Sequence, residues 1–305
     1  MSPLRFTNWQ ISPVTSATTN TPATGWAWIA GASDGFGRAL AEACAEAGYP
    51  VLLIARRSEL LRNVCAHIEA KFGVATHAVT MDLAQEGLVE ILQPMLTTHP
   101  PAIAIYNAAY VPIGPLTEQP LEELQQSLQV NTHGPLAWCW LVAKAMQART
   151  PQTQTATKSI VLMSSLAGNQ GAPNLATYAA TKAFNTILAE GLWAELRNTG
   201  IQVLVCTAGA IGNANLSAVA SKPAPGTLAP KHLARDVLSA IRTKQSSPRL
   251  CPGWINKIAD RLLGRWLPRR WSITVMGQNT QGLSAADTIT HTPSNSATRV
   301  NEETP

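Results

Sequence analysis

A glycine-rich segment near the start of the chain constrains its fold more than any other feature. It reads Gly31-Ala32-Ser33-Asp34-Gly35-Phe36-Gly37, and it lies between an apolar run at 26–30 and an alanine-rich run at 38–48. This order predicts a buried strand, a tight turn and a helix, because glycine permits the turn and alanine favours the helix. The unpaired N–H groups at a helix N-terminus bind a pyrophosphate. We therefore expect this turn to hold a dinucleotide through Gly31, Ser33, Asp34, Gly35, Phe36 and Gly37.

The remainder of the chain alternates apolar runs with helical patterns. Strands are expected at 51–54, 75–80, 102–106, 159–163 and 201–206, and helices at 58–71, 85–97, 121–147 and 230–243. Such alternation predicts an α/β fold with a Rossmann-like, doubly wound parallel sheet. We expect a single domain at 25–276, a flexible N-terminal segment at 1–24 and a disordered tail at 277–305, because both ends are rich in polar residues and proline.

A second motif supplies acid–base chemistry. Tyr178 and Lys182 lie four residues apart in the proline-free run 174–198, and Ser165 lies thirteen residues before Tyr178. Residues four apart on a helix share one face. A tyrosine phenol titrates about three units above neutral pH, so it needs a nearby cation to exchange protons usefully. Together with the glycine-rich turn, these residues indicate a hydride-transfer site.

The motifs occur in the order and spacing of a known family. Gly-x-x-x-Gly-x-Gly, Asn107-Ala108-Ala109, Asn131, Ser165 and Tyr178-x-x-x-Lys182 follow one another. On these residues the chain resembles the short-chain dehydrogenase/reductase (SDR) family, over about residues 25–206. Four positions depart from the family's usual pattern at the cofactor rim, and they are Ala30, Ala109, Ala208 and Asn213.

The resemblance implies a role for each catalytic residue. Tyr178 gives a proton to the carbonyl oxygen, and Ser165 hydrogen-bonds that oxygen as it gains negative charge. Lys182 lowers the tyrosine pKa and holds the nicotinamide ribose, while Asn131 holds a water that leads protons to Lys182. The thirteen-residue spacing selects Ser165 over its neighbour Ser164. Further cofactor contacts are implied for Asp82, Leu83, Asn107, Ala108, Tyr178, Lys182, Ala208, Gly209 and Ile211.

The residues after the second strand bear on the choice of cofactor. An acidic side chain there would bond the ribose 2′-hydroxyl of NAD, whereas this chain has Arg56 and Arg57. Guanidinium groups suit a 2′-phosphate, so we expect NADP(H) rather than NAD(H). The alternative is that both arginines are solvated charges at the start of the next helix.

The segments expected to border the nicotinamide are apolar. Residues 166–175 and 211–219 contain no charged side chain. We therefore expect a carbonyl reductase for an apolar ketone, aldehyde or 3-oxoacyl substrate. Two alternatives stay open: an alcohol or hydroxysteroid dehydrogenase running oxidatively, and a non-catalytic NADP-binding sensor.

Composition restricts partners and location. The net charge is +5, but the basic residues do not form a groove with interleaved aromatic residues, so we expect no nucleic-acid partner. We expect the protein to form a homo-oligomer. There is no Cys-x-x-Cys or His-x-x-x-His, which argues against a metal site. The absence of an apolar N-terminal leader predicts a cytoplasmic protein. Free thiols are expected at Cys44, Cys65, Cys139, Cys206 and Cys251.

The segment 254–271 is amphipathic and basic. Apolar residues at 254, 255, 258, 262, 263 and 266 share one side of a helix, and three basic residues occupy another. We expect a helical lid over the substrate pocket in which Leu262 and Trp266 are buried. The alternative is a basic interfacial helix that makes a peripheral membrane contact.

Overall fold

The computed structural model describes residues 25–149, 158–212 and 226–280. Its centre is a seven-stranded parallel sheet in the order β3-β2-β1-β4-β5-β6-β7. The order reverses between β1 and β4, as in a doubly wound fold. The strands are β1 (Trp26–Ala30), β2 (Val51–Ala55), β3 (Thr76–Thr80), β4 (Pro101–Tyr106), β5 (Ser159–Ser165), β6 (Gln202–Ala208) and β7 (Arg249–Leu250).

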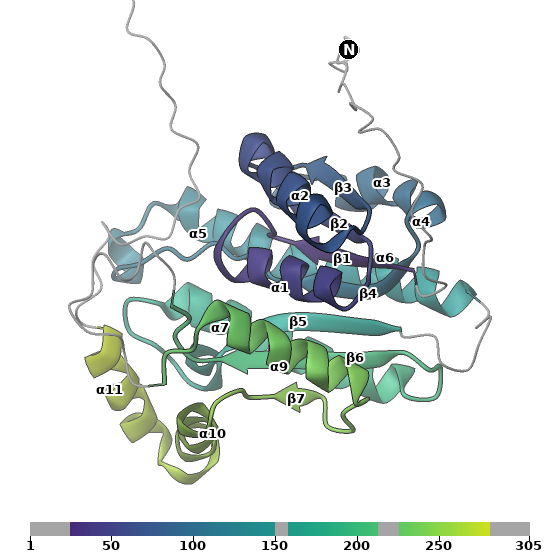
Figure 1. Ribbon diagram of the computed structural model, residues 1–305. Coiled ribbons are helices and arrows are strands. Elements are labelled where there is room, and N and C mark those ends of the chain that lie inside the picture. The colour runs from purple at the N-terminus through teal and green to yellow at the C-terminus, as the bar shows by residue number, and fades with distance from the viewer. Residues whose placement is uncertain (1–24, 150–157, 213–225, 281–305) are drawn as a thin grey trace, which may run out of the picture.

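Helices cover both faces of the sheet (Figure 1). One face packs against α1 (Gly35–Glu46), α2 (Ser58–Phe72) and α9 (Pro230–Arg242). The other packs against α3 (Leu88–Leu92), α6 (Gly134–Ala148) and α7 (Ala176–Leu196). The remaining helical elements are α4 (Met95–Thr98), η1 (Leu116–Glu118), α5 (Leu121–Leu128), η2 (Gln129–His133), η3 (Leu166–Asn169), α10 (Trp254–Arg261), η4 (Leu262–Trp266) and α11 (Arg269–Thr280).

The predicted fold class is confirmed, and two helix predictions need correction. The expected helix at 85–97 is two short helices, because Pro94 lacks the N–H that a continuous helix would need and instead precedes α4. The expected helix at 121–147 contains a π-helical turn, η2, between α5 and α6. The short edge strand β7 and the helix α11 were not expected from the sequence.

The amphipathic segment forms α10 and η4 at one corner of the molecule, beside the β7 edge and next to α11 (Figure 1). The expectation that Leu262 and Trp266 are buried is wrong, since they are 42% and 77% exposed. In the next helix, α11, the side chains of Ser272, Ile273 and Met276 are buried or half-buried against the protein. No helix in the described ranges is long and apolar enough to span a membrane.

Candidate active site

The sheet topology brings the expected site residues to one edge. The strands are parallel, so their carboxyl ends lie together. The glycine-rich turn follows β1, Arg56 follows β2, and Asn107 follows β4. Ser165 is the last residue of β5. A ligand at the switch point between β1 and β4 would therefore meet all of these segments, as the general rule for open α/β sheets predicts.

The turn after β1 has the geometry of a phosphate cradle. Gly31 and Gly35 have positive φ angles of 82° and 55°, which other residues rarely adopt. A side chain on Gly37 would overlap the carbonyl oxygen of Gly31, so the turn must pass close to α1 there. Asn107 Nδ2 donates to the same carbonyl oxygen at 3.0 Å. A Cβ at Gly35 would meet no atom within 4 Å, so the start of α1 is open there, and a helix N-terminus favours an anionic group such as a pyrophosphate.

The two arginines after β2 lie beside this turn. Arg57 Nη2 donates to Ser33 Oγ at 3.0 Å and lies 3.8 Å from a carboxylate oxygen of Asp34. Arg56 Nη1 lies 3.9 Å from Asp82 Oδ2. The alternative was that both arginines are solvated charges at the start of the next helix. Arg57 does lie just before α2, but its side chain contacts the glycine-rich turn. The arrangement suits a 2′-phosphate at this position.

Tyr178, Ser165 and Lys182 meet between β5 and α7. Burial raises the pKa of Tyr178, and a hydrogen bond with Ser165 partly offsets that rise. Lys182 Nζ lies 5.5 Å from the centre of the tyrosine ring and donates to the carbonyl oxygen of Met163 at 3.0 Å. Burial lowers the pKa of Lys182 to about 8. The site therefore holds a protonated phenol next to a lysine whose positive charge is disfavoured by burial. The expectation that Lys182 lowers the pKa of Tyr178 is not met here, because burial dominates and the lowering comes from the hydrogen bond with Ser165.

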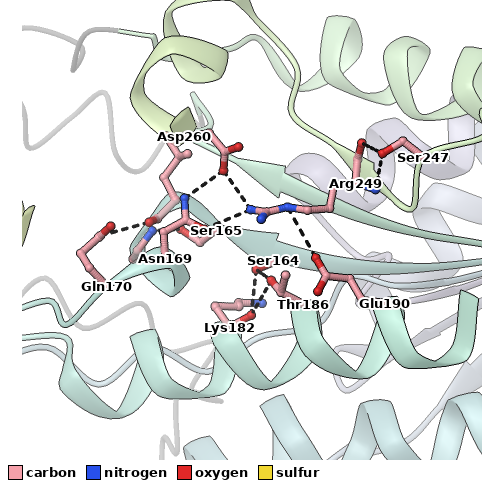
Figure 2. A network of polar contacts seen from close by, with 12 residues as sticks. Ser164, Ser165, Asn169, Gln170, Lys182, Thr186, Glu190, Ser247, Arg249 and Asp260 are labelled. Atoms are coloured by element: carbon pink, nitrogen blue, oxygen red, sulfur yellow. Dashed lines mark hydrogen bonds and ion pairs between the residues drawn. The ribbon is translucent and has the colours of Figure 1, made fainter. Parts of the chain in front are cut away.

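The structure separates the two neighbouring serines. Ser164 Oγ donates to the backbone oxygen of Lys182 at 2.8 Å and lies 2.8 Å from Thr186 Oγ1 (Figure 2). Ser164 therefore ties β5 to α7. Ser165 instead lies beside Tyr178, and its Oγ accepts from the backbone N–H of Ala167 at 3.2 Å. Residues at adjacent strand positions point to opposite sides of the sheet, which explains the division.

Asn131 lies in the π-helical turn η2 and is fully buried. Its Oδ1 accepts from the backbone N–H of Tyr110 at 2.9 Å, and its Nδ2 donates to the oxygen of Tyr110 at 2.8 Å. Nδ2 also lies 3.2 Å from Thr181 Oγ1, one residue before Lys182. The side chain thus fixes the segment after β4 against α7. The water expected beside Asn131 stays a prediction.

A polar network joins the C-terminal helices to the segment after Ser165. Arg249 Nη2 donates to Asp260 Oδ1 at 2.9 Å and to Asn169 Oδ1 at 3.1 Å, and Arg249 Nε lies 3.9 Å from Glu190 (Figure 2). Asn169 Nδ2 also donates to Asp260 Oδ1 at 2.9 Å. Arg269 donates to the backbone oxygen of Asn169 at 2.6 Å. Sequence reasoning missed this network, because its members are far apart along the chain.

Asp260→Asn tests the network. The change keeps the size of the side chain but removes its charge, so we expect a loss of about 1 kcal/mol of unfolding free energy, since the pair is partly exposed. Amide hydrogen exchange in 166–169 should accelerate, because η3 loses a fixed partner. Glu59→Gln, at an exposed position on α2, is the matched control. Unchanged exchange in η3 would show that the network does not hold this segment.

A family model described as short chain dehydrogenase matches residues 25–223. The chain belongs to this family. As a short-chain dehydrogenase it is an oxidoreductase, and the predicted family, fold and enzyme class are confirmed.

Curated relatives of this short-chain dehydrogenase are very-long-chain 3-oxoacyl-CoA reductases. The protein from Phaeosphaeria nodorum is 28% identical over 262 residues, which is 82% of this chain and 74% of the relative. The one from Ajellomyces capsulatus is 33% identical over 226 residues, or 72% of this chain and 64% of the relative. The one from Laccaria bicolor is 32% identical over 183 residues, or 58% of this chain and 52% of the relative. The chain thus spans little more than half the length of some curated relatives.

Solved structures share the fold. A 7β-hydroxysteroid dehydrogenase is 23% identical with a TM-score of 0.74, covering 83% of this chain and 96% of that one. A short-chain dehydrogenase from Sphingobium yanoikuyae in complex with NADPH is 23% identical with a TM-score of 0.66, covering 89% of this chain and 98% of that one. At this identity the likeness supports the fold alone.

Several expectations for this short-chain dehydrogenase have a clear outcome. All five cysteines are free thiols. Leu83 and Phe36 have buried side chains that pack in the core, so only their backbones are available to a cofactor. His133 is exposed. Asn213 and the rest of the apolar segment to 219 lie outside the described residues, and the homo-oligomer and cytoplasmic location stay predictions.

Proposed function

We propose that this short-chain dehydrogenase is an NADP(H)-dependent reductase of apolar carbonyl compounds, and that a 3-oxoacyl thioester with a long acyl chain is its best substrate class. The observation that carries the proposal is the meeting of Tyr178 with Ser165 and Lys182 at the carboxyl edge of the sheet. The nicotinamide supplies the hydride when bound. The protein's residues supply the proton and the stabilisation of charge.

Tyr178 is the proposed acid. Its raised pKa keeps the phenol protonated at neutral pH, so it can donate to the carbonyl oxygen as that oxygen gains electron density. Ser165 is beside it to hydrogen-bond the same oxygen. The ammonium group of Lys182 stabilises the phenolate left by the transfer, since an opposite charge nearby favours the ionised phenol. Asn131 is a positioning residue, because its hydrogen bonds fix α7 beside Lys182.

The proposed cofactor contacts follow the same edge. The pyrophosphate would lie over the turn at Gly35, and the adenosine 2′-phosphate would meet Arg56 and Arg57. Asp82, whose Oδ1 accepts from the backbone N–H of Ala84 at 2.9 Å, borders the adenine end. Asn107 and Ala108 follow β4, Ala208 is the last residue of β6, and Gly209 and Ile211 come after it, so these residues would border the nicotinamide end.

A buried apolar cluster beside Tyr178 supports the substrate class. Ala167, Ala172, Leu175, Ala179 and Ile113 form a buried cluster against which Tyr178, Val111 and Met276 pack. Apolar surroundings of this kind next to the proposed acid favour an apolar substrate over a sugar or a charged acid. The names of the curated relatives agree, because those proteins are very-long-chain 3-oxoacyl-CoA reductases.

The test is NADPH oxidation with 3-oxoacyl thioesters of increasing chain length, compared with small ketones and with sugars. We expect kcat/KM to rise with acyl length, by up to about threefold to fourfold per added methylene, because each buried CH₂ contributes ~0.8 kcal/mol. A rate that does not depend on chain length would contradict the substrate class. If the protein oxidised a hydroxysteroid with NADP but reduced none of these carbonyl compounds, that result would favour the oxidative alcohol or hydroxysteroid dehydrogenase. Binding of NADP with no turnover of any substrate would favour the non-catalytic sensor.

Arg57→Ala tests the choice of cofactor. We expect NADPH affinity to fall by about 1 to 3 kcal/mol, the range for a charge-assisted hydrogen bond, while NADH affinity changes little. Fluorescence titration of both cofactors measures the difference. Arg62→Ala, at an exposed position on α2, is the control and should leave both affinities unchanged. Equal losses for NADPH and NADH would show that Arg57 does not contact the 2′-phosphate.

A further inference from the structure

Helix α10 presents its polar side to the protein and its apolar side outward. Asn256 is 2% exposed, and its Nδ2 donates to the backbone oxygens of Pro252 and Gly226 at 3.0 and 3.1 Å. One turn later, Asp260 accepts from Arg249 at 2.9 Å. On the other side, Trp254 is 72% exposed and Ile258 is 47% exposed. A surface helix ordinarily has the opposite orientation, so its polar contacts, not its apolar face, hold α10 in place.

Exposed apolar residues continue beyond α10, through η4 and into α11. We name this stretch the C-terminal apolar face and define it by Trp254, Ile255, Ile258, Leu262, Trp266, Leu267 and Trp271, all of which are exposed. Trp266 is 77% exposed and Trp271 is 55% exposed. Single exposed apolar residues are normal, but seven in one short segment mark an interaction surface.

Positive charge accompanies this face. Residues 254–280 contain five of the chain's 23 Lys and Arg residues and one of its 18 acidic residues, so they hold +4 of the chain's net +5. Lys257, Arg261 and Arg270 are exposed. The acidic residue, Asp260, is paired with Arg249 and does not offset these charges on the outer side.

We propose that the C-terminal apolar face docks on the surface of an anionic phospholipid bilayer. Tryptophan and basic side chains are enriched at the level of the lipid headgroups, because each has an apolar part that contacts the acyl chains and a polar part that stays in water. The acidic headgroups attract each nearby Lys or Arg. A second copy of this face is a poorer occupant, because pairing two identical surfaces would bring their positive charges together.

Docking would place the candidate active site next to the bilayer. Helix α11 contributes Trp271 to the outer face, while its Ile273 lies against Gly171 and its Met276 packs with the cluster that borders Tyr178. Arg269 and Asp260 join the same helices to η3, directly after Ser165. An apolar substrate dissolved in lipid would therefore have a short path to the site. This consequence rests on the proposed function, whereas docking itself does not.

The experiment is co-sedimentation of the full chain with phosphatidylcholine vesicles that contain phosphatidylserine, compared with phosphatidylcholine vesicles alone. We expect binding to the anionic vesicles, weaker binding to the neutral ones, and partial release by salt. Trp254→Ser, Trp266→Ser and Trp271→Ser combined should weaken binding by at least about tenfold. Lys257→Gln, Arg261→Gln and Arg270→Gln combined should remove the preference for anionic vesicles.

The matched control replaces apolar residues of similar exposure elsewhere. Leu121 on α5 and Trp140 on α6 are 62% and 52% exposed, and their replacement by Ser should leave vesicle binding intact. Tyr178→Phe should also bind vesicles like the unchanged protein, which separates a failure of docking from a failure of the proposed function. The proposal is overturned if the unchanged protein stays in the supernatant, if the tryptophan variant binds normally, or if the control variant loses binding equally. If the tryptophan substitutions changed the oligomeric mass of the protein in solution but not its vesicle binding, the face would be assigned to contact with a second copy of the chain.

Discussion

Replacement of Tyr178 by phenylalanine should lower kcat by about 10²- to 10⁴-fold, the usual contribution of a positioned general acid. The hydroxyl is expected to act on the substrate and not on the dinucleotide, so cofactor affinity should stay within a few-fold. The ring remains, which preserves the packing against the apolar cluster at Ile113 and Leu175. Steady-state NADPH oxidation and a cofactor titration measure the two quantities.

The adjacent serines provide the control for this result. Ser165→Ala should also lose most turnover, because Ser165 lies beside Tyr178. Ser164→Ala should instead lower stability by about 1 kcal/mol through the loss of its bond to the Lys182 backbone, and should retain activity. Near-normal turnover in Tyr178→Phe would remove the proposed acid, and equal activity losses in both serine variants would remove the distinction between them.

Lys182→Met should abolish most activity and yet make the cofactor-free protein more stable at pH 7. Lys182 is 3% exposed, and burial lowers its pKa from 10.5 to about 8. At about 1.4 kcal/mol per pKa unit, keeping this charge at pH 7 costs on the order of 3 kcal/mol. Methionine removes the charge at similar length but also removes the hydrogen bond to Met163, worth about 1 kcal/mol. The net gain should be about 1 to 2 kcal/mol.

The pH dependence gives a second check on Lys182. Between pH 8 and 10.5 the unfolded protein keeps a proton on Lys182 that the folded protein has released, so stability rises with pH across this window. The methionine variant lacks this rise, and its advantage should shrink between pH 7 and pH 9.5 in urea unfolding. Lys231→Met, at an exposed position on α9, should show no such trend. A variant that is less stable at pH 7, or an advantage that is constant with pH, would contradict the cost assigned to the buried charge.

The apolar periodicity of 254–266 correctly indicated an amphipathic helix, but the expectation that its apolar side faces inward was wrong. Periodicity shows which residues share a face and does not show what that face contacts. The orientation is decided by Asn256 and Asp260, whose partners Gly226, Pro252 and Arg249 come from other segments.

The same distinction applies at the candidate site. The spacing of Tyr178 and Lys182 was readable from the sequence, because residues four apart on a helix always share a side. The sequence did not reveal the hydrogen bond from Lys182 to Met163 or the pairing of Asn131 with Tyr110, because these bonds join residues on different elements. Asn131 stood out as a motif residue, but its role in fixing α7 depends on the π-helical turn that points its side chain inward.

The sequence by itself determined the strand, turn and helix at Gly31–Gly37, the alternation that makes a parallel sheet, and the residue types of the site. These features depend on local backbone freedom and on short-range periodicity, which neighbouring residues specify. Only the tertiary structure decided the strand order, the separation of Ser164 from Ser165, the network around Arg249 and the outward face of α10. Each of these depends on which distant segments supply hydrogen-bond partners and burial, and no short stretch of the chain contains that information.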